Sequence, residues 1–421
     1  MPFGLVGWRP DVLAPRDEIV IAGESGPLRR RIPKLAAVAV VAALAIALSA
    51  VALNLLSTSF DDGYLESAQP TGSSPTPDSS PTAVATARPT PTVAGDPPSD
   101  RVTAFYYGWY GTPAIDGKWR HWGQGGHTPP SDLGAAFEPA IGPYSSHDSA
   151  VLATHMQELV AARVGTIAVS WWGPGSFDDL GLPAIINAAG AAGNGVALHI
   201  EPYKGRTASS IGRDIRAFVT QYGALPGLAR AIRPTTFGTS TSARPVVYIY
   251  QPRLVDEVAL RDAIDGLRGT AADVVVLVQT TGVALVERLH ADGLYSYDVY
   301  AVDGTKWDKL LGQCRDKNYL CSPSVGPGYD ERRATTGGRS IDRADGARYD
   351  EMWSRAIAAG AEWVSITSFN EWHEGTQIEP AVTPAGPPYA DYDGAYGQTG
   401  TGAEGAYLEA TATWVGRLEG P

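Results

Sequence analysis

Apolar runs alternate with helix-like stretches along most of the chain. Eight runs rich in β-branched and aromatic residues have the composition of buried strands, and they span residues 102–107, 166–171, 196–201, 246–250, 273–279, 293–298, 321–325 and 363–369. Helical patterns separate several of them, as in HDSAVLATHMQELVAARV and ARYDEMWSRAIAAGA. Eight strands alternating with helices predict an α/β fold, a (β/α)8 TIM-like barrel. A doubly wound open sheet is the alternative, but no GxGxxG turn follows the first run.

The first hundred residues show a different pattern. Residues 35–56 form an uncharged apolar stretch that is long enough to cross a bilayer as a transmembrane helix. Basic residues precede it and acidic ones follow, so the positive-inside rule predicts 1–34 as a cytoplasmic tail. A cleaved signal peptide is the alternative, although its apolar region is usually only about 7–15 residues long. Residues 57–100, rich in Pro, Ser and Thr, predict a disordered stalk before a catalytic domain over 101–421.

Charge and cysteine content narrow the classes of function. The net charge is −12, and the first 34 residues carry six basic and four acidic side chains, so the remainder is more acidic still. An acidic body argues against binding of nucleic acid, whose phosphates require clustered Lys and Arg. Cys314 and Cys321 form no CxxC motif, which argues against redox chemistry and Cys-based zinc binding. Outside the cell they could form one small-loop disulfide; two free thiols are the alternative.

Aromatic and polar residues gather where the candidate strands end. The strand ends read YYGWYG, SWWGPG, HIEPYKGR, YIYQ, YSYD, SVGPGYD and SFNEWHEG. Active sites of TIM barrels are built at the carboxyl ends of the strands. The repetition at seven strand ends therefore predicts one shared, aromatic-lined cleft.

The last of these motifs carries the most chemistry. A zincin motif would need a second histidine four residues after His373, but Gln377 stands there, so we expect neither a metal nor another cofactor. Glu371 and Glu374 are three apart, and a single turn would present both on one side. Glycoside hydrolysis needs one protonated and one ionised carboxyl group. We expect Trp372 and the apolar strand to raise one pKa by desolvation, with His373 or Asn370 keeping the other group ionised.

The motifs together resemble a known family, glycoside hydrolase family 99, in order from about residue 102 to the end of the chain. They are FYYGWYGTPAIDGKWRHW, PYSSHD, VSWWGPG, HIEPYKGR, PSVGPGYD and ITSFNEWHEGTQIEP. The family contains endo-α-1,2-mannosidases and bacterial endo-α-1,2-mannanases. The resemblance implies a metal-independent barrel enzyme that cuts inside α-mannosidic chains with retention. It implies that Glu371 acts as base on the substrate's own 2-hydroxyl, giving a 1,2-anhydro sugar, and that Glu374 protonates the leaving oxygen and then activates water.

The resemblance also implies a set of substrate-binding residues, with packing in the core as the alternative for each aromatic. The set comprises Tyr107, Trp109, Tyr110, Trp171, Trp172, Glu201, Tyr203, Tyr250, Tyr295, Tyr297, Asn370 and His373. Stretches 295–304 and 330–350 depart from the family pattern at the expected rim of the cleft, where glycan preference is set. Glu379 receives no role beyond a structural one.

These observations predict a monomeric, membrane-anchored enzyme on a bacterial surface, with its catalytic domain outside the cell. Its partner would be an α-mannose-containing oligo- or polysaccharide. Two alternatives remain open. A transglycosylase acting on envelope glycans would use the same carboxylates, whereas a non-catalytic cell-surface glycan-binding protein would use only the cleft.

Overall fold

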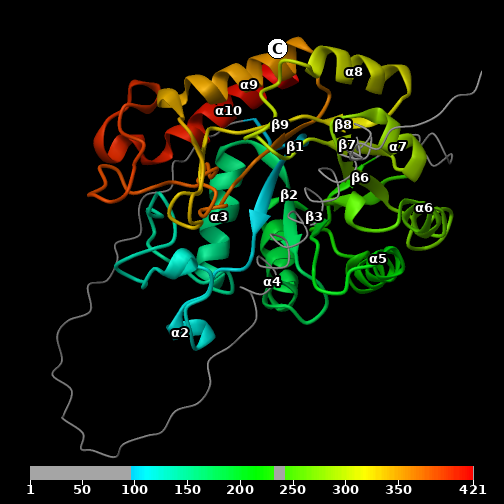
Figure 1. Ribbon diagram of the computed structural model, residues 1–421, viewed down its shortest axis with the longest axis horizontal. Helices are drawn as coiled ribbons and strands as arrows, with labels where there is room; N and C mark the ends of the chain where they lie inside the picture. Colours follow the sequence, from blue (N-terminus) through cyan, green and yellow to red (C-terminus); the bar gives the residue numbers. More distant parts are fainter. Residues whose placement is uncertain (1–95, 232–241, 421) are drawn as a thin grey trace, which may run out of the picture. The chain divides into compact units, whose positions relative to one another are not determined.

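The structure is a computed structural model that describes residues 96–231 and 242–420 (Figure 1). The predicted tail 1–34, the predicted anchor 35–56 and most of the predicted stalk 57–100 lie outside the described residues. Within the described ranges, no helix combines the length and apolar character needed to cross a membrane.

Parallel strands form one sheet in the order β8-β7-β6-β5-β3-β2-β1-β12-β9. Their bounds are β1 Ser99–Tyr107, β2 Val164–Trp171, β3 Gly195–Ile200, β5 Arg244–Ile249, β6 Val275–Gln279, β7 Gly293–Tyr295, β8 Leu320–Ser322, β9 Ser324–Val325 and β12 Val364–Ile366. The short β8 and β9 flank Pro323 in one segment, which pairs with β7 on one side and with β12 on the other. The sheet therefore returns on itself as a nearly closed parallel barrel, consistent with the predicted (β/α)8 fold.

Each of the eight predicted strands is present, and two of them end three residues earlier than predicted. The run 293–298 leaves the sheet after Tyr295, because Tyr297 adopts a left-handed backbone with φ 56°. The run 363–369 leaves it after Ile366, because the backbone N–H of Ser368 bonds to the carbonyl of Thr376 in the following loop (2.9 Å). Both early ends deliver polar side chains to the mouth of the barrel.

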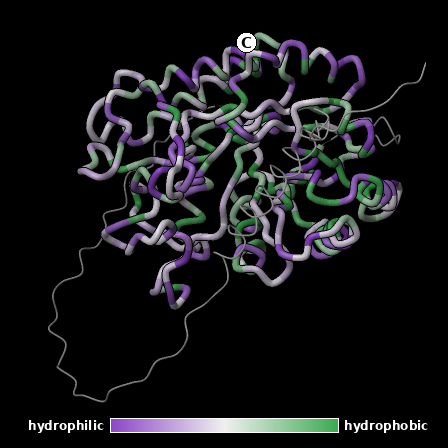
Figure 2. The backbone as a smooth tube through the Cα atoms, viewed as in Figure 1, coloured by the Kyte–Doolittle hydropathy of each residue, from purple (hydrophilic) through white to green (hydrophobic). Residues whose placement is uncertain are grey.

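Helices follow most of the strands and surround the barrel (Figure 1). The longer ones are α3 Ser149–Ala161, α4 Phe177–Ala192, α5 Ala208–Tyr222, α6 Glu257–Asp265, α7 Val283–Leu289, α8 Trp307–Asp316, α9 Ala347–Ala358 and α10 Ala406–Glu419. Side-chain caps fix where several begin; for example, Thr207 and Ser210 form a reciprocal capping box at the start of α5. Hydrophobic stretches lie mainly on the strands and hydrophilic ones mainly in outer loops (Figure 2).

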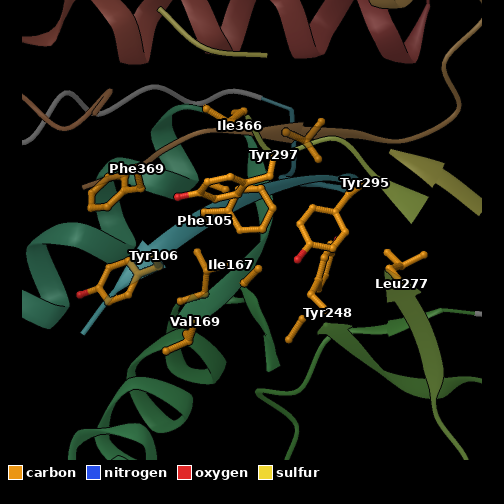
Figure 3. Close-up of a cluster of buried hydrophobic side chains, with 14 of the residues drawn as sticks. Phe105, Tyr106, Ile167, Val169, Tyr248, Leu277, Tyr295, Tyr297, Ile366 and Phe369 are labelled. Atoms are coloured by element: carbon orange, nitrogen blue, oxygen red, sulfur yellow. The ribbon is translucent and has the colours of Figure 1, made fainter. Parts of the chain in front are cut away.

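Aromatic rings fill the interior of the barrel. Phe105 on β1 has its ring centroid 5.8 Å from that of Tyr248, 5.4 Å from that of Tyr295 and 5.0 Å from that of Tyr297, as the close-up in Figure 3 shows. The next residue, Tyr106, points to the other face of the sheet, as the two-residue period of a strand requires. This aromatic cluster packs beneath the side chains at the carboxyl ends of the strands.

A disulfide joins Cys314 near the end of α8 to Cys321 in β8 (S–S 2.05 Å). Of the two alternatives that the sequence left open, the structure thus contains the disulfide rather than two thiols.

Candidate active site

The loop after β12 folds back tightly on itself. The hydroxyl of Ser368 accepts a hydrogen bond from the backbone N–H of Glu371 (2.8 Å) and contacts the hydroxyl of Thr376 (2.9 Å). Gly375 has φ 60°, and a Cβ at this position would lie 2.9 Å from the backbone nitrogen of Asp330. Glycine is therefore required for the loop to pass beneath the chain that follows β9. The fold of this loop fixes where each side chain of NEWHE points.

Asn370 and Trp372 both point into the protein, away from Glu371 between them. Asn370 accepts a hydrogen bond from the backbone N–H of Tyr107 (2.7 Å) and donates one to its carbonyl (3.0 Å). The hydroxyl of Tyr110 donates to the backbone carbonyl of Asn370 and accepts from the backbone N–H of Trp372, both at 3.1 Å. Asn370 and Tyr110, predicted to bind substrate, are instead fully buried and fasten this loop to the end of β1.

Glu371 is buried, and its two carboxylate oxygens have different surroundings. Oε1 accepts a hydrogen bond from the backbone N–H of His373 (3.1 Å) and lies 3.3 Å from the ring Nδ1 of the same residue. The other ring nitrogen of His373 donates to the carbonyl of His121 (2.8 Å), which fixes the orientation of the ring. Oε2 has no hydrogen-bond partner among the described residues. A buried acceptor of this kind is costly unless a ligand supplies a donor.

Glu374 lies beside Glu371 in a different electrostatic setting. Burial, followed by the negative charge of Glu371, raises the pKa of Glu374 well above its ordinary value, and Asp298, Glu331 and Glu201 act in the same direction. Trp372, predicted to desolvate one of the carboxyl groups, turns its indole to Glu379 instead (Nε1 to Oε2, 2.8 Å). The pair thus combines one group with an open acceptor position, Glu371, and one whose raised pKa favours the protonated form, Glu374.

The raised pKa of Glu374 has a consequence for stability. Between the ordinary carboxyl pKa and the raised one, the unfolded chain loses this proton while the folded chain keeps it, so stability falls as pH rises through that window. Glu374→Gln removes this titration and is expected to raise the melting temperature at pH 7, with a smaller gain near pH 4.5. Calorimetry at both pH values checks it, with Glu351→Gln on the surface of α9 as a control expected to change little. A Glu374→Gln protein that melts no higher than wild type at pH 7 would contradict the assignment.

Three tyrosines of the predicted substrate-binding set lie near the carboxylate pair. The hydroxyls of Tyr107 and Tyr297 share a hydrogen bond, and the ring of Tyr250 lies 4.9 Å from that of Tyr297. Burial raises the pKa of all three; the next cause is Glu371 for Tyr107 and Glu374 for Tyr297 and Tyr250. These hydroxyls therefore remain protonated and can donate hydrogen bonds.

Two half-buried tryptophans form an aromatic wall next to the pair. The ring of Trp109 stacks on that of His121 at 4.6 Å and on that of Trp172 at 6.2 Å. Burial, with the charges of His373 and Arg120, lowers the pKa of His121 to about 3, so its ring is neutral at ordinary pH. A wall of this kind presents flat apolar faces, which suit the C–H faces of a sugar.

Two further predicted binding residues lie in the core instead. Tyr295 is fully buried inside the barrel, where its hydroxyl bonds to a ring nitrogen of His199 (2.8 Å). Trp171 is buried, and its indole N–H donates to Asp179 on α4 (2.7 Å). Both rings therefore pack in the core: Trp171 because the alternation of the strand turns it toward α4, and Tyr295 because it lies within the aromatic cluster inside the barrel.

Glu201 and Tyr203, which follow β3, separate in the same way. The carboxylate of Glu201 accepts a hydrogen bond from Ser170 (2.9 Å) and lies close enough to the pair to raise the pKa of Glu374. The hydroxyl of Tyr203 donates to Asp214 on α5. Glu201 therefore lies near the carboxylate pair, whereas the hydroxyl of Tyr203 bonds to α5.

Sequence reasoning missed Tyr329. Burial, followed by the charge of Glu374, raises the pKa of Tyr329, and its hydroxyl donates to Glu331 (2.8 Å). It stands in β10 (Tyr329–Asp330), which pairs with β11 (Ser340–Ile341) in a short antiparallel hairpin. The motif SVGPGYD was the available signal, since it placed a tyrosine after a strand end.

Within residues 96–231 and 242–420, no cluster of three or more His, Cys, Asp or Glu side chains is arranged to hold a metal ion. A parallel barrel with two adjacent carboxyl groups, tyrosine hydroxyls and stacked tryptophans at the carboxyl ends of its strands has the site of a glycoside hydrolase.

Comparison with known proteins specifies the class further. The sequence profile of Glycosyl hydrolase family 99 matches residues 97–420. The chain is 33% identical over 352 residues to a glycoprotein endo-alpha-1,2-mannosidase of Rattus norvegicus, covering 74% of each protein. It is 34% identical over 358 residues to a human glycoprotein endo-alpha-1,2-mannosidase-like protein, again covering 74% of each. A solved GH99 endo-alpha-mannosidase from Bacteroides thetaiotaomicron superposes with a TM-score of 0.67 at 32% identity, over 76% of this chain and 98% of that one. The chain belongs to glycoside hydrolase family 99, and it is a glycoside hydrolase.

Proposed function

We propose that the protein is a retaining, endo-acting hydrolase of internal α-mannosidic linkages, with α-1,2-mannan or a mannoside-containing glycan as its substrate. The names of its relatives support the mannoside. The observation that carries the chemistry is the asymmetry of the pair: Glu371 has an acceptor oxygen without a partner, and Glu374 has a raised pKa.

In the proposed first step, the substrate's own 2-hydroxyl is the nucleophile. Oε2 of Glu371 takes the proton of this hydroxyl while O2 forms a bond to C1, and the C1–O bond to the leaving sugar breaks. Glu374 gives its proton to the leaving oxygen. The 2-hydroxyl and the glycosidic oxygen of an α-mannoside lie on opposite faces of the ring, so backside attack produces a 1,2-anhydro sugar. The unpartnered oxygen of Glu371 meets the requirement for a base that accepts one proton.

In the second step the two carboxyl groups reverse their roles. Glu374, now ionised, takes a proton from water, whose oxygen attacks C1 and opens the epoxide. The proton held by Glu371 returns to O2. Two inversions at C1 give net retention. Tyr107, Tyr297 and Tyr250 would donate to the ring substituents, and the aromatic wall of Trp109 and Trp172 would hold a neighbouring sugar.

Incubation of the full-length protein with α-1,2-linked mannooligosaccharides should release internal fragments. NMR of the fresh products should show the α configuration at the new reducing end. The same site can pass the sugar to an acceptor hydroxyl, and longer oligosaccharides would then accumulate as a sign of transglycosylation. Binding without turnover would favour the non-catalytic alternative and overturn the proposal. EDTA is expected to have little effect, and strong inhibition would contradict the metal-independent chemistry.

We also propose the placement of the enzyme that its sequence pattern favours: residues 1–34 cytoplasmic, 35–56 a membrane anchor, 57–100 a linker and 101–421 a monomeric catalytic domain outside a bacterial cell. The uncharged apolar stretch and the basic residues before it support this placement.

A further inference from the structure

A second carboxylate, Glu379, lies buried behind the loop that carries Glu371. Its Oε2 accepts hydrogen bonds from the indole N–H of Trp372 and the hydroxyl of Tyr144, both at 2.8 Å. Its Oε1 lies 3.1 Å from the ring Nε2 of His155 on α3. Glu379 is 1% exposed and His155 is fully buried, so solvent screens none of these contacts.

The orientation of His155 follows from its two neighbours. A carboxylate only accepts hydrogen bonds, so Nε2 of His155 carries the proton that faces Glu379. In the neutral ring Nδ1 is then an acceptor, and it receives the hydroxyl of Tyr106 from β1 (2.9 Å). The chain of hydrogen bonds runs without a break from β1 through α3 to Glu379. A buried polar network whose members are all satisfied is rigid, because each displaced member would leave another without a partner.

This network is tied to both neighbours of Glu371. Trp372 bonds directly to Glu379, and the amide of Asn370 donates to the hydroxyl of Tyr144 (3.2 Å), which in turn bonds to Glu379. The residue on each side of the proposed base is therefore held from behind by one buried carboxylate. Glu379 makes no hydrogen bond to Glu371 itself among the described contacts, so any effect on the base passes through the backbone at 370–372.

We propose that Glu379 and His155 are positioning residues that hold Glu371 at the place and angle where Oε2 can take the proton of the substrate's 2-hydroxyl. The proposal rests on the role proposed above for Glu371. Acid–base catalysis is sensitive to such alignment, since a displacement of about 1 Å costs about 10²-fold in rate. If the network only stabilised the fold, a substitution that disrupts it would lower the melting temperature and leave the turnover of the folded protein unchanged.

The test is Glu379→Gln, which keeps the size of the side chain and can rotate its oxygen to Trp372 and Tyr144. We expect kcat on α-1,2-linked mannooligosaccharides to fall about 10–100-fold, with KM changed by less than about threefold. The matched control is Asp292→Asn. Asp292 is also buried and accepts from the backbone N–H of Val276 (2.8 Å) and from Arg268 (2.9 Å), but it stands before β7, at the opposite end of the barrel. Asp292→Asn should lower the melting temperature without lowering kcat.

Trp372→Phe supplies a second variant, because it removes the N–H donor and leaves Glu379 in place. Its kcat should fall in the same sense, and the double variant should be no slower than the slower single one, since both act through one contact. A Glu379→Gln enzyme with wild-type kcat overturns the proposal, as do equal losses of kcat in Glu379→Gln and Asp292→Asn. A wild-type protein without activity on these substrates would refute the proposed function first, and with it the role of Glu371 on which positioning depends.

Discussion

Glu371→Gln is expected to lower kcat about 10²–10⁴-fold with little change in KM. The amide keeps the shape of the side chain and can still accept from the backbone N–H of His373 through its oxygen. Its NH2 group then occupies the position of Oε2, so that a hydrogen-bond donor rather than an acceptor faces the substrate's 2-hydroxyl. Tyr107 and Tyr297 would not replace Glu371 as the base, because their pKa values are raised and their hydroxyls keep their protons.

The chemistry of this variant is separated from its folding by two controls. Glu351→Gln on the surface of α9 should keep wild-type kinetics, and circular dichroism of Glu371→Gln should match the wild-type spectrum. A substrate that lacks the 2-hydroxyl at the cleaved mannose should be inert with the wild-type enzyme, because the nucleophile is then absent. A sugar ester on Glu371, detected by mass spectrometry of the peptide that contains it, would show that the carboxylate itself attacks and would contradict the assignment.

Glu374→Gln is expected to be about 10²–10⁴-fold slower on natural linkages, and its defect should depend on the leaving group. An aryl α-mannoside with an acidic phenol leaves without a proton, so kcat/KM for that substrate should recover most of the loss. kcat should remain low, because the water that opens the epoxide still lacks its base. The comparison therefore separates the two tasks of one residue.

Steady-state rates on a series of aryl α-mannosides, whose phenol leaving groups have decreasing pKa values, measure this effect. In wild type kcat/KM should depend only weakly on the pKa of the leaving phenol, and in Glu374→Gln it should depend on it strongly. If the variant loses the same factor on every substrate, Glu374 is not the acid for the leaving oxygen. Full activity on natural linkages would remove it from the chemistry altogether.

Much of the barrel could be predicted because its strands are buried on both faces and therefore read as continuous apolar runs. Glu371 and Glu374 could be placed at the mouth because they directly follow such a run. The prediction failed at finer detail, where Asn370 and Tyr110 turned inward. The sequence pattern shows that Trp171 and Trp172 face opposite sides of a strand, but it does not show which of them faces the cleft.

The role of Glu379 could not be read from the sequence, because its partners are distant along the chain. His155 is 224 positions away and Tyr144 is 235 positions away. Local spacing carries information about one turn or one strand, and such a network exists only after the barrel has closed. Tyr329 reached the carboxylates in the same way, through the path of the chain after β9.

The interruption of the barrel wall at Pro323 is bridged by a side chain. β8 and β9 contribute three and two residues to the ladder, and the proline between them has no N–H to donate. The hydroxyl of the next residue, Ser324, accepts a hydrogen bond from the backbone N–H of Tyr297 (2.7 Å). The chain that leaves β9 is in turn bound to the catalytic loop, since the backbone N–H of Asp330 donates to the carbonyl of Glu374 (2.6 Å). A displacement of the wall at Pro323 would therefore move the rim and the proposed acid together, so that the outer sugar positions and the reacting centre are mechanically coupled.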